Sequence, residues 1–148
     1  MEEYKIRARN NLLSAKDRFE YYREHEDNYP DEVSKQDELV LIMEDLYQSY
    51  RMALMHLHYI RDKRLPRKRT ISELSKSVYI QATTYENLLP FSGRLDDFHD
   101  EYVYDIIDFD ITENFVYFMY AHVTTFYDLC GKLKYADEQH IYIEDNAS

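Results

Sequence analysis

The side chains best suited to chemistry are a few histidines and one cysteine. His56 and His58 lie two residues apart, and on a helix such side chains point about 200° apart, so they cannot share one metal ion unaided. His122 lies on an apolar helical stripe, where a hydrogen-bonded core histidine is the common case. Cys130, the single cysteine, has no histidine near it in sequence and lies close to the same stripe. This placement favours a small buried side chain over a nucleophile.

Other catalytic motifs have no counterpart in the chain. The acidic residues at 96–101 could gather a hard cation, but they lack the glycine turn and fixed spacing of an EF-hand. The only two glycines, Gly93 and Gly131, cannot build a phosphate loop or a dinucleotide fingerprint, and no G-x-S-x-G sequence occurs. We therefore expect no metal, no cofactor and no enzymatic activity.

Charge is distributed very unevenly along the chain. Residues 1–76 hold 15 Lys/Arg and 15 Asp/Glu, whereas residues 77–148 hold 3 and 14, so the net charge of -11 belongs to the second half. On a helix, the carboxylates from 97 to 108 step along one side, roughly opposite an apolar stripe. We call the whole acidic set the acidic ridge and predict that it binds a partner: Asp96, Asp97, Asp100, Glu101, Asp105, Asp108, Asp110 and Glu113.

Two interpretations of the acidic ridge stay open. Adjacent carboxylates repel one another, and a partner that supplies cations relieves this repulsion. Carboxylates spaced along a helix also present a field like that of a nucleic-acid backbone, which suggests a nucleic-acid mimic or an acidic inhibitor. The alternative is a solvated face that only keeps the protein soluble.

A basic patch flanks Pro66, with six cations within nine residues. It could hold phosphates, pair with the acidic ridge of a second copy in a homodimer, or place cations at the C-terminal end of a helix, where the helix dipole favours them. The negative net charge argues against direct binding to nucleic acid. The patch consists of Arg61, Lys63, Arg64, Arg67, Lys68 and Arg69.

The segment from Arg51 to His56, RMALMH, resembles the R-x4-6-H motif of HEPN domains. This resemblance implies a helical bundle that either cleaves RNA as a dimer, with Arg51 and His56 at its centre, or binds without catalysis. The segment departs from the family pattern because Met52 follows the arginine and because the pair lies inside a long apolar stripe. Five residues apart on a helix, the two side chains would point about 140° apart.

Composition predicts a single helical domain over residues 1–148. Hydrophobic residues make up 45% of the chain and charged residues 32%, which is typical of a folded globular protein. Only 2 Gly and 3 Pro leave few of the turns that an all-β protein needs. The charged N-terminus, the single cysteine and the lack of a long apolar run lead us to expect a cytoplasmic protein with no membrane contact.

Apolar residues recur at helical spacing in five stretches. They predict a compact antiparallel bundle of four or five helices, with residues 133–148 as a peripheral tail in which 140–143 could be extended. Predicted start signals are Ser34 with Asp37, Thr70 with Glu73, and Thr112. The stripes are Ala8, Leu12, Ala15, Phe19 and Tyr22; Leu39, Met43, Leu46, Tyr50, Ala53, Leu57 and Ile60; Ile71, Leu74, Val78, Ala82, Tyr85 and Leu89; Leu95, Phe98, Tyr102 and Ile106; and Phe115, Met119, His122, Phe126, Leu129 and Leu133.

The chain is rich in tyrosine, with 16 of them. Tyrosine suits the boundary between core and water, but an excess of exposed tyrosine also marks binding surfaces. Five tyrosines fall outside the stripes, namely Tyr21, Tyr59, Tyr104, Tyr117 and Tyr120. Acidic, tyrosine-rich character resembles that of phage-encoded inhibitors of host defence, including anti-CRISPR and DNA-mimic proteins. The sequence therefore favours a non-enzymatic interaction protein that binds a basic nucleic-acid-handling protein.

Overall fold

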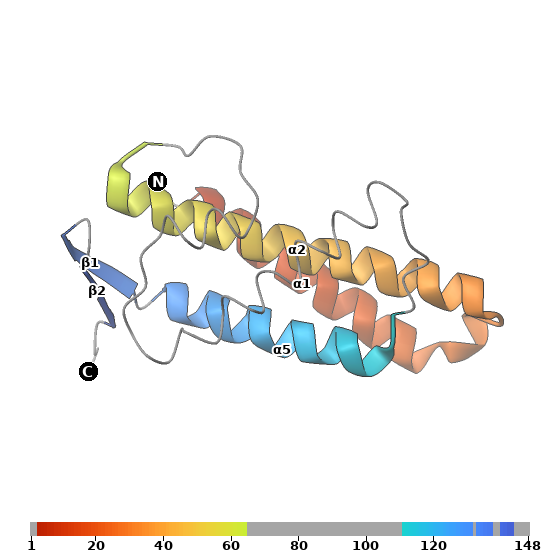
Figure 1. Cartoon of the computed structure of the whole chain (residues 1–148). Coiled ribbons are helices and arrows are strands. Elements are labelled where there is room, and N and C mark those ends of the chain that lie inside the picture. The colour runs from red at the N-terminus through yellow and green to blue at the C-terminus, as the bar shows by residue number, and fades with distance from the viewer. Residues whose placement is uncertain (1–2, 65–110, 132, 138–139, 144–148) are drawn as a thin grey trace.

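The computed structural model describes residues 3–64, 111–131, 133–137 and 140–143 (Figure 1). Three long helices form the body of this part, as predicted, while the stripes at 71–89 and 95–106 lie outside the described residues. Within the described part, no helix combines the length and the apolar character needed to cross a bilayer. In chain order the elements are α1 (Glu3–Glu24), the 3-10 turn η1 (Glu26–Asn28), α2 (Glu32–Asp62), α5 (Glu113–Cys130), β1 (Leu133–Asp137) and β2 (His140–Ile143).

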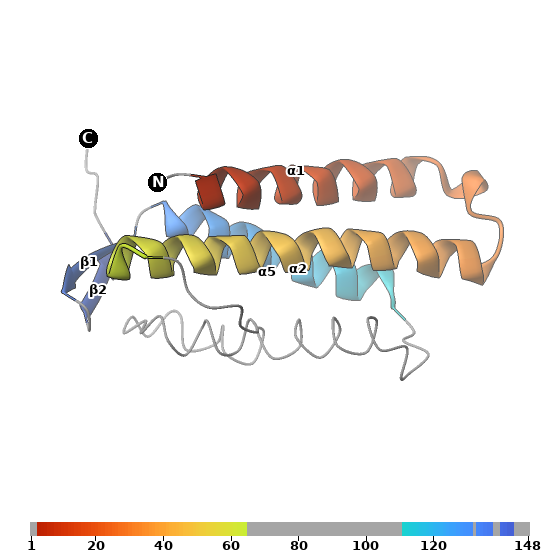
Figure 2. The same cartoon turned by 90° about the horizontal axis from the view of Figure 1, so that it is seen from above.

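The helices are not all antiparallel. α1 runs against both α2 and α5, but α2 and α5 run in the same direction (Figures 1 and 2). Contacts at two levels agree: Gln36 bonds to Ile111 near the start of both helices, and further along the Tyr50 and Phe126 rings lie 4.5 Å apart. The helices adjacent in the sequence, α1 and α2, are therefore antiparallel, as predicted, whereas α2 and α5 are not adjacent in the predicted bundle of four or five helices. The chain leaves α2 at one end of the bundle and begins α5 at the other.

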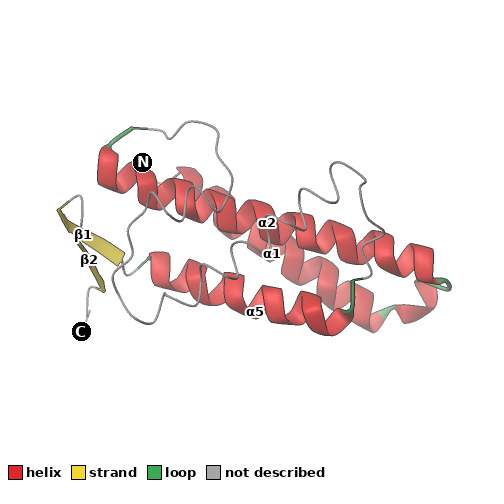
Figure 3. Ribbon diagram, viewed as in Figure 1, coloured by secondary structure: helices red, strands yellow, loops and turns green. Residues whose placement is uncertain are grey.

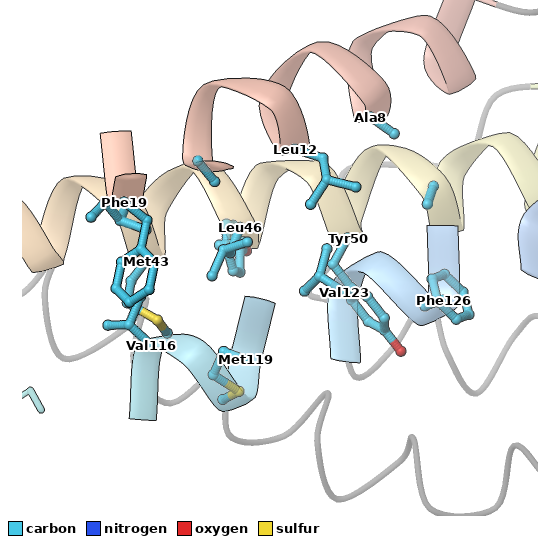
Figure 4. Close-up of a cluster of buried hydrophobic side chains, with 14 of the residues drawn as sticks. Ala8, Leu12, Phe19, Met43, Leu46, Tyr50, Val116, Met119, Val123 and Phe126 are labelled. Atoms are coloured by element: carbon cyan, nitrogen blue, oxygen red, sulfur yellow. The ribbon is translucent and has the colours of Figure 1, made fainter. Parts of the chain in front are cut away.

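The core lies between the three helices, with α2 contacting both of the others (Figure 4). The predicted stripe of α1 is buried along its whole length, and that of α2 is buried except for Ile60, which is partly buried against the core. Ala8 is fully buried, and its carbonyl accepts a 2.7 Å hydrogen bond from the Ser49 hydroxyl. An alanine at this point leaves room for the two backbones to approach.

The buried face of α5 is turned slightly from the predicted stripe. Val116 and Val123 are buried, whereas Phe115 is only partly buried. His122 is half-buried, and its Nδ1 lies 2.9 Å from the Phe118 carbonyl oxygen on an exposed part of the helix. The predicted core histidine is therefore hydrogen-bonded, as expected, but it is not in the core. The valines take its place because they fill apolar space without an imidazole to desolvate.

The start of α2 lies earlier than predicted. Asp31, and not Ser34, is the N-cap: the Ser34 N–H donates to the Asp31 Oδ1 at 2.7 Å, and the Asp31 N–H lies 3.4 Å from the Ser34 hydroxyl. The hydrogen bonds from Ser34 hold the pKa of the Asp31 carboxyl below its usual value. Pro30 precedes this capping box, as expected of a residue that separates two helices.

The predicted cap of the last helix is confirmed. The Thr112 hydroxyl accepts a hydrogen bond from the Phe115 N–H at 3.1 Å. The helix ends at Cys130, and Gly131 follows it, so Leu133 belongs to a strand and not to the helical stripe. β1 and β2 pair antiparallel, with Leu133 opposite Ile143 (Figure 3). The extended conformation expected for residues 140–143 is thus confirmed.

A side-chain bridge fixes the start of α5 against α2. The Gln36 amide donates to the Ile111 carbonyl at 2.6 Å and accepts from the Ile111 N–H at 2.8 Å, so both backbone groups of Ile111 are satisfied by one side chain. Ile111 itself is buried. Sequence patterns gave no sign of this role, because glutamine on a helix ordinarily faces water.

We expect Gln36→Ala to lower the free energy of unfolding by about 1–3 kcal/mol, because it leaves both backbone groups of buried Ile111 without partners. Urea denaturation followed by circular dichroism measures this change. Gln48→Ala is the matched control, since the Gln48 amide bonds to Glu44 one turn away on the same helix, and loss of this bond should cost at most about 0.5 kcal/mol. Equal losses from the two variants would contradict the role of Gln36.

Candidate interaction surface

Only one residue of the acidic ridge belongs to the described part. Asp96, Asp97, Asp100, Glu101, Asp105, Asp108 and Asp110 lie outside the described residues, and Glu113 is the first residue of α5. The structure therefore describes the C-terminal end of the acidic ridge, at Glu113, and not the rest of it. That end is held firmly, because Gln36 bonds to Ile111 and Thr112 caps α5 directly before Glu113.

Glu113 is half-buried at the start of α5. Its carboxylate is close enough to the hydroxyl of Tyr22, a core residue of α1 that is only 4% exposed, to raise the pKa of that hydroxyl. Burial of the hydroxyl and the negative charge of Glu113 raise the pKa of Tyr22 to about 12 from 10.0. Glu113 is thus partly engaged by its own chain, while a carboxylate in the first turn also complements the helix dipole.

The first half of the basic patch surrounds the end of α2. Arg61 is in the last turn of the helix, Lys63 follows as its C-cap, and Arg64 comes next, whereas Arg67, Lys68 and Arg69 lie outside the described residues. Lys63 and Arg64 are exposed. Lys63 has the left-handed conformation, with φ 59°, and its N–H donates to the Tyr59 carbonyl at 2.7 Å. This placement fits cations that complement the negative end of the α2 dipole.

The residues of the HEPN-like motif lie within one unbroken helix. α2 is continuous from Glu32 to Asp62, so helical geometry turns Arg51 about 140° away from His56. His56 is buried, and Arg51 is half-buried. The His58 Nδ1 lies 3.2 Å from the Asp62 Oδ2 one turn later, and both side chains are largely shielded from water. Arg51 and His56 of one chain therefore do not converge on a single phosphate group.

Tyrosines outside the predicted stripes divide into exposed and half-buried ones. Tyr117 and Tyr21 are 56% and 48% exposed, as expected for surface residues. Tyr59 and Tyr120 are half-buried, and Tyr104 lies outside the described residues. Tyr21 is held in place, because its ring stacks on His25 and its hydroxyl accepts a 3.0 Å hydrogen bond from the Asn28 amide.

Cys130 is a buried side chain, as predicted. The residue is 4% exposed, and burial raises the pKa of its thiol above the usual range despite the nearby Lys5 ammonium. A protonated, enclosed thiol is a poor nucleophile at neutral pH. Among the described residues, no group of three or more His, Cys, Asp or Glu side chains is arranged to hold a metal ion.

We expect the Tyr22 hydroxyl to titrate near pH 12 in the folded protein and near 10.0 after unfolding. Because the neutral form is favoured by folding, its contribution to stability is complete below pH 10.0 and is lost as the pH rises towards 12. Phenolate absorbance of the wild type minus that of Tyr22→Phe isolates this one group. A difference curve centred near 10.0 in the native protein would contradict the Tyr22–Glu113 contact, and the same titration in urea is the control.

Comparisons with known proteins identify no relative of this chain. A scan against protein-family models, a search of curated proteins and a search of solved structures each find no match to this chain.

Proposed function

We propose that this chain is a non-enzymatic interaction protein whose acidic ridge, Asp96 to Glu113, binds a basic protein that handles nucleic acid. The observation that carries the proposal is the charge of residues 77–148, with 14 Asp/Glu against 3 Lys/Arg. In character the proposed function resembles that of phage-encoded inhibitors, including anti-CRISPR and DNA-mimic proteins. A basic groove that normally receives phosphates is the surface most complementary to such a row of carboxylates.

Two physical arguments support this assignment. Repulsion between neighbouring carboxylates is relieved when a partner supplies cations at short range, where salt screens least. The C-terminal end of the ridge is also attached to a fixed point, because Gln36 and Thr112 hold the start of α5. A fixed attachment reduces the conformational entropy that binding must remove.

The same proposal includes a four- or five-helix bundle. The apolar stripes at 71–89 and 95–106, with Thr70 and Glu73 as a capping box, are the sequence features that support further helices. Packing them on the described helices would give the acidic ridge a helical support, with its carboxylates on one side.

We expect far-UV circular dichroism of the whole chain to give a helix content of about two thirds or more if both stripes are helical. The three described helices hold 71 of the 148 residues, which is close to half. A measured content near one half would contradict the four- or five-helix architecture. Trifluoroethanol provides the upper reference, because it induces helix beyond the native content.

We expect the fourfold variant Asp97→Asn, Asp100→Asn, Asp105→Asn and Asp108→Asn to lose the binding of a basic partner. The tagged protein is immobilised and incubated with an extract of its native host, and captured proteins are identified by mass spectrometry. Wild-type protein should retain basic nucleic-acid-binding proteins at low salt and release them towards 1 M salt, where the screening length falls to about 3 Å.

The matched control removes four exposed carboxylates from another surface, with the changes Asp17→Asn, Glu20→Gln, Glu24→Gln and Asp27→Asn. Both variants lose the same amount of negative charge, so only the position of the carboxylates differs. The control should keep the partner. Equal loss of partner binding in both variants would show that only net charge matters and would contradict a site on the ridge. Partner binding by the ridge variant would contradict it too.

A further inference from the structure

One flank of α1 carries a row of cations. Arg9, Lys16 and Arg23 recur every seven residues, which places them on one line along the helix at intervals of about 10.5 Å. All three side chains are exposed. The row lies directly beside the buried stripe of α1, on the side that faces α5. We call Arg9, Lys16 and Arg23 the cationic row.

The position of Arg23 beside α5 indicates the direction of this flank. The Arg23 guanidinium lies 5.9 Å from the centre of the Tyr117 ring, near the start of α5. The charge of Arg9 acts on Tyr127, near the end of the helix, where it lowers a pKa that burial raises. Since the two helices are antiparallel, Lys16 comes between these two levels, and the cationic row follows the edge where α1 meets α5.

The cationic row differs from the other arginines of α1 in its partners. Arg7 pairs with Glu3 at 2.7 Å, and Arg18 lies 3.5 Å from Glu38 and 3.4 Å from Asp45. Within the described residues, by contrast, neither Arg9, Lys16 nor Arg23 forms an ion pair with a carboxylate. The protein has 29 acidic residues. In the described part, none of their carboxylates forms an ion pair with the three aligned cations.

The facing surface of α5 is polar but almost uncharged. Between Glu113 and Asp128 the helix has no Asp, Glu, Lys or Arg. Two of its tyrosines, Tyr117 and Tyr127, are near cations of this row, and their hydroxyls can donate hydrogen bonds to an anion. Tyr120 and Tyr127 are partly buried against the core, and the Tyr117 ring is approached by Arg23. These rings are therefore poorly placed for the base stacking that single-stranded nucleic acid requires.

Cations at every seventh position beside an apolar stripe occupy the place that pairs with a neighbouring helix in helical bundles. Acidic side chains of the neighbour, repeated at the same interval, complete such pairs and select the partner. An acidic helix matches the cationic row both in sign and in its spacing of about 10.5 Å. At physiological salt the screening length is about 8 Å, so distant carboxylates of this acidic protein weaken the local attraction little, whereas exposed Glu20, one turn from Lys16, is close enough to act on the row.

We propose that the edge between α1 and α5 binds an acidic helix of a partner protein, with Arg9, Lys16 and Arg23 pairing with carboxylates seven residues apart and the α5 tyrosines beside them. This surface is separate from the acidic ridge and of opposite sign. The protein then has two interaction surfaces, one for basic and one for acidic partners.

The test uses a fluorescent helical peptide of about 22 residues that carries glutamates at three positions seven residues apart, measured by anisotropy on the full chain. A second peptide has the same composition, with the glutamates moved to the opposite side of its apolar stripe. Wild-type protein should bind the first peptide more tightly than the second. No binding of the first peptide would overturn the proposal, and this result would follow if another part of the chain covered the edge. Tighter binding of a twenty-residue oligothymidine than of the peptide would also overturn it.

Variants identify the residues responsible. Arg9→Gln with Lys16→Gln and Arg23→Gln should weaken peptide binding by about tenfold or more, from three exposed ion pairs. The control, Arg7→Gln with Lys35→Gln and Arg64→Gln, removes the same charge elsewhere and should change binding by about twofold or less. Restoring charge with Arg9→Lys and Arg23→Lys should recover most of the affinity. Equal effects of the two triple variants would overturn the assignment.

Discussion

Burial of α2 against both α1 and α5 is the interaction on which the described structure depends. A helix packed on one side buries one line of residues, whereas α2 buries its predicted stripe except Ile60 and also Ile42, Tyr47 and Leu54. Because α2 is enclosed on two sides, its neighbours cannot move independently of it. α1 packs on one side through small residues such as Ala8 and Ala15, and α5 packs on the other through Val116, Val123 and Phe126.

Polar contacts determine the register of that packing. Ser49 bonds to the Ala8 carbonyl between α1 and α2, and Gln36 bonds to Ile111 between α2 and α5. Apolar surfaces alone allow neighbouring helices to slide, since dispersion and burial are non-directional. Directional bonds that would be costly to leave unmade select one alignment. The exposed charges of α1 can then differ between its two flanks, with Arg18 paired on one flank and the cationic row on the other.

Helical stripes were predictable from the sequence because the apolar period of a one-sided helix is direct evidence of its buried face. The stripes of α1 and α2, and the cap at Thr112, are confirmed. The N-cap of α2 was misplaced because Asp31 and Ser34 are both good caps and only geometry distinguishes them. The role of Gln36 was not predictable, because it is a tertiary contact with no local pattern. The cationic row has a signal in the sequence, namely the seven-residue interval of Arg9, Lys16 and Arg23 beside the first stripe.

The shared direction of α2 and α5 has a consequence for how the molecule assembles. Seven residues, 25–31, connect α1 to α2, whereas fifty residues, 63–112, separate α2 from α5. Contacts between α2 and α5 therefore join parts of the chain that are much further apart in sequence than those between α1 and α2, and bringing distant parts together costs more chain entropy. We infer that the α1–α2 hairpin forms early, from contacts close in sequence, and that docking of α5 is the late, slower event. The hairpin then exposes to solvent, for a short time, the apolar face of α2 that α5 later covers.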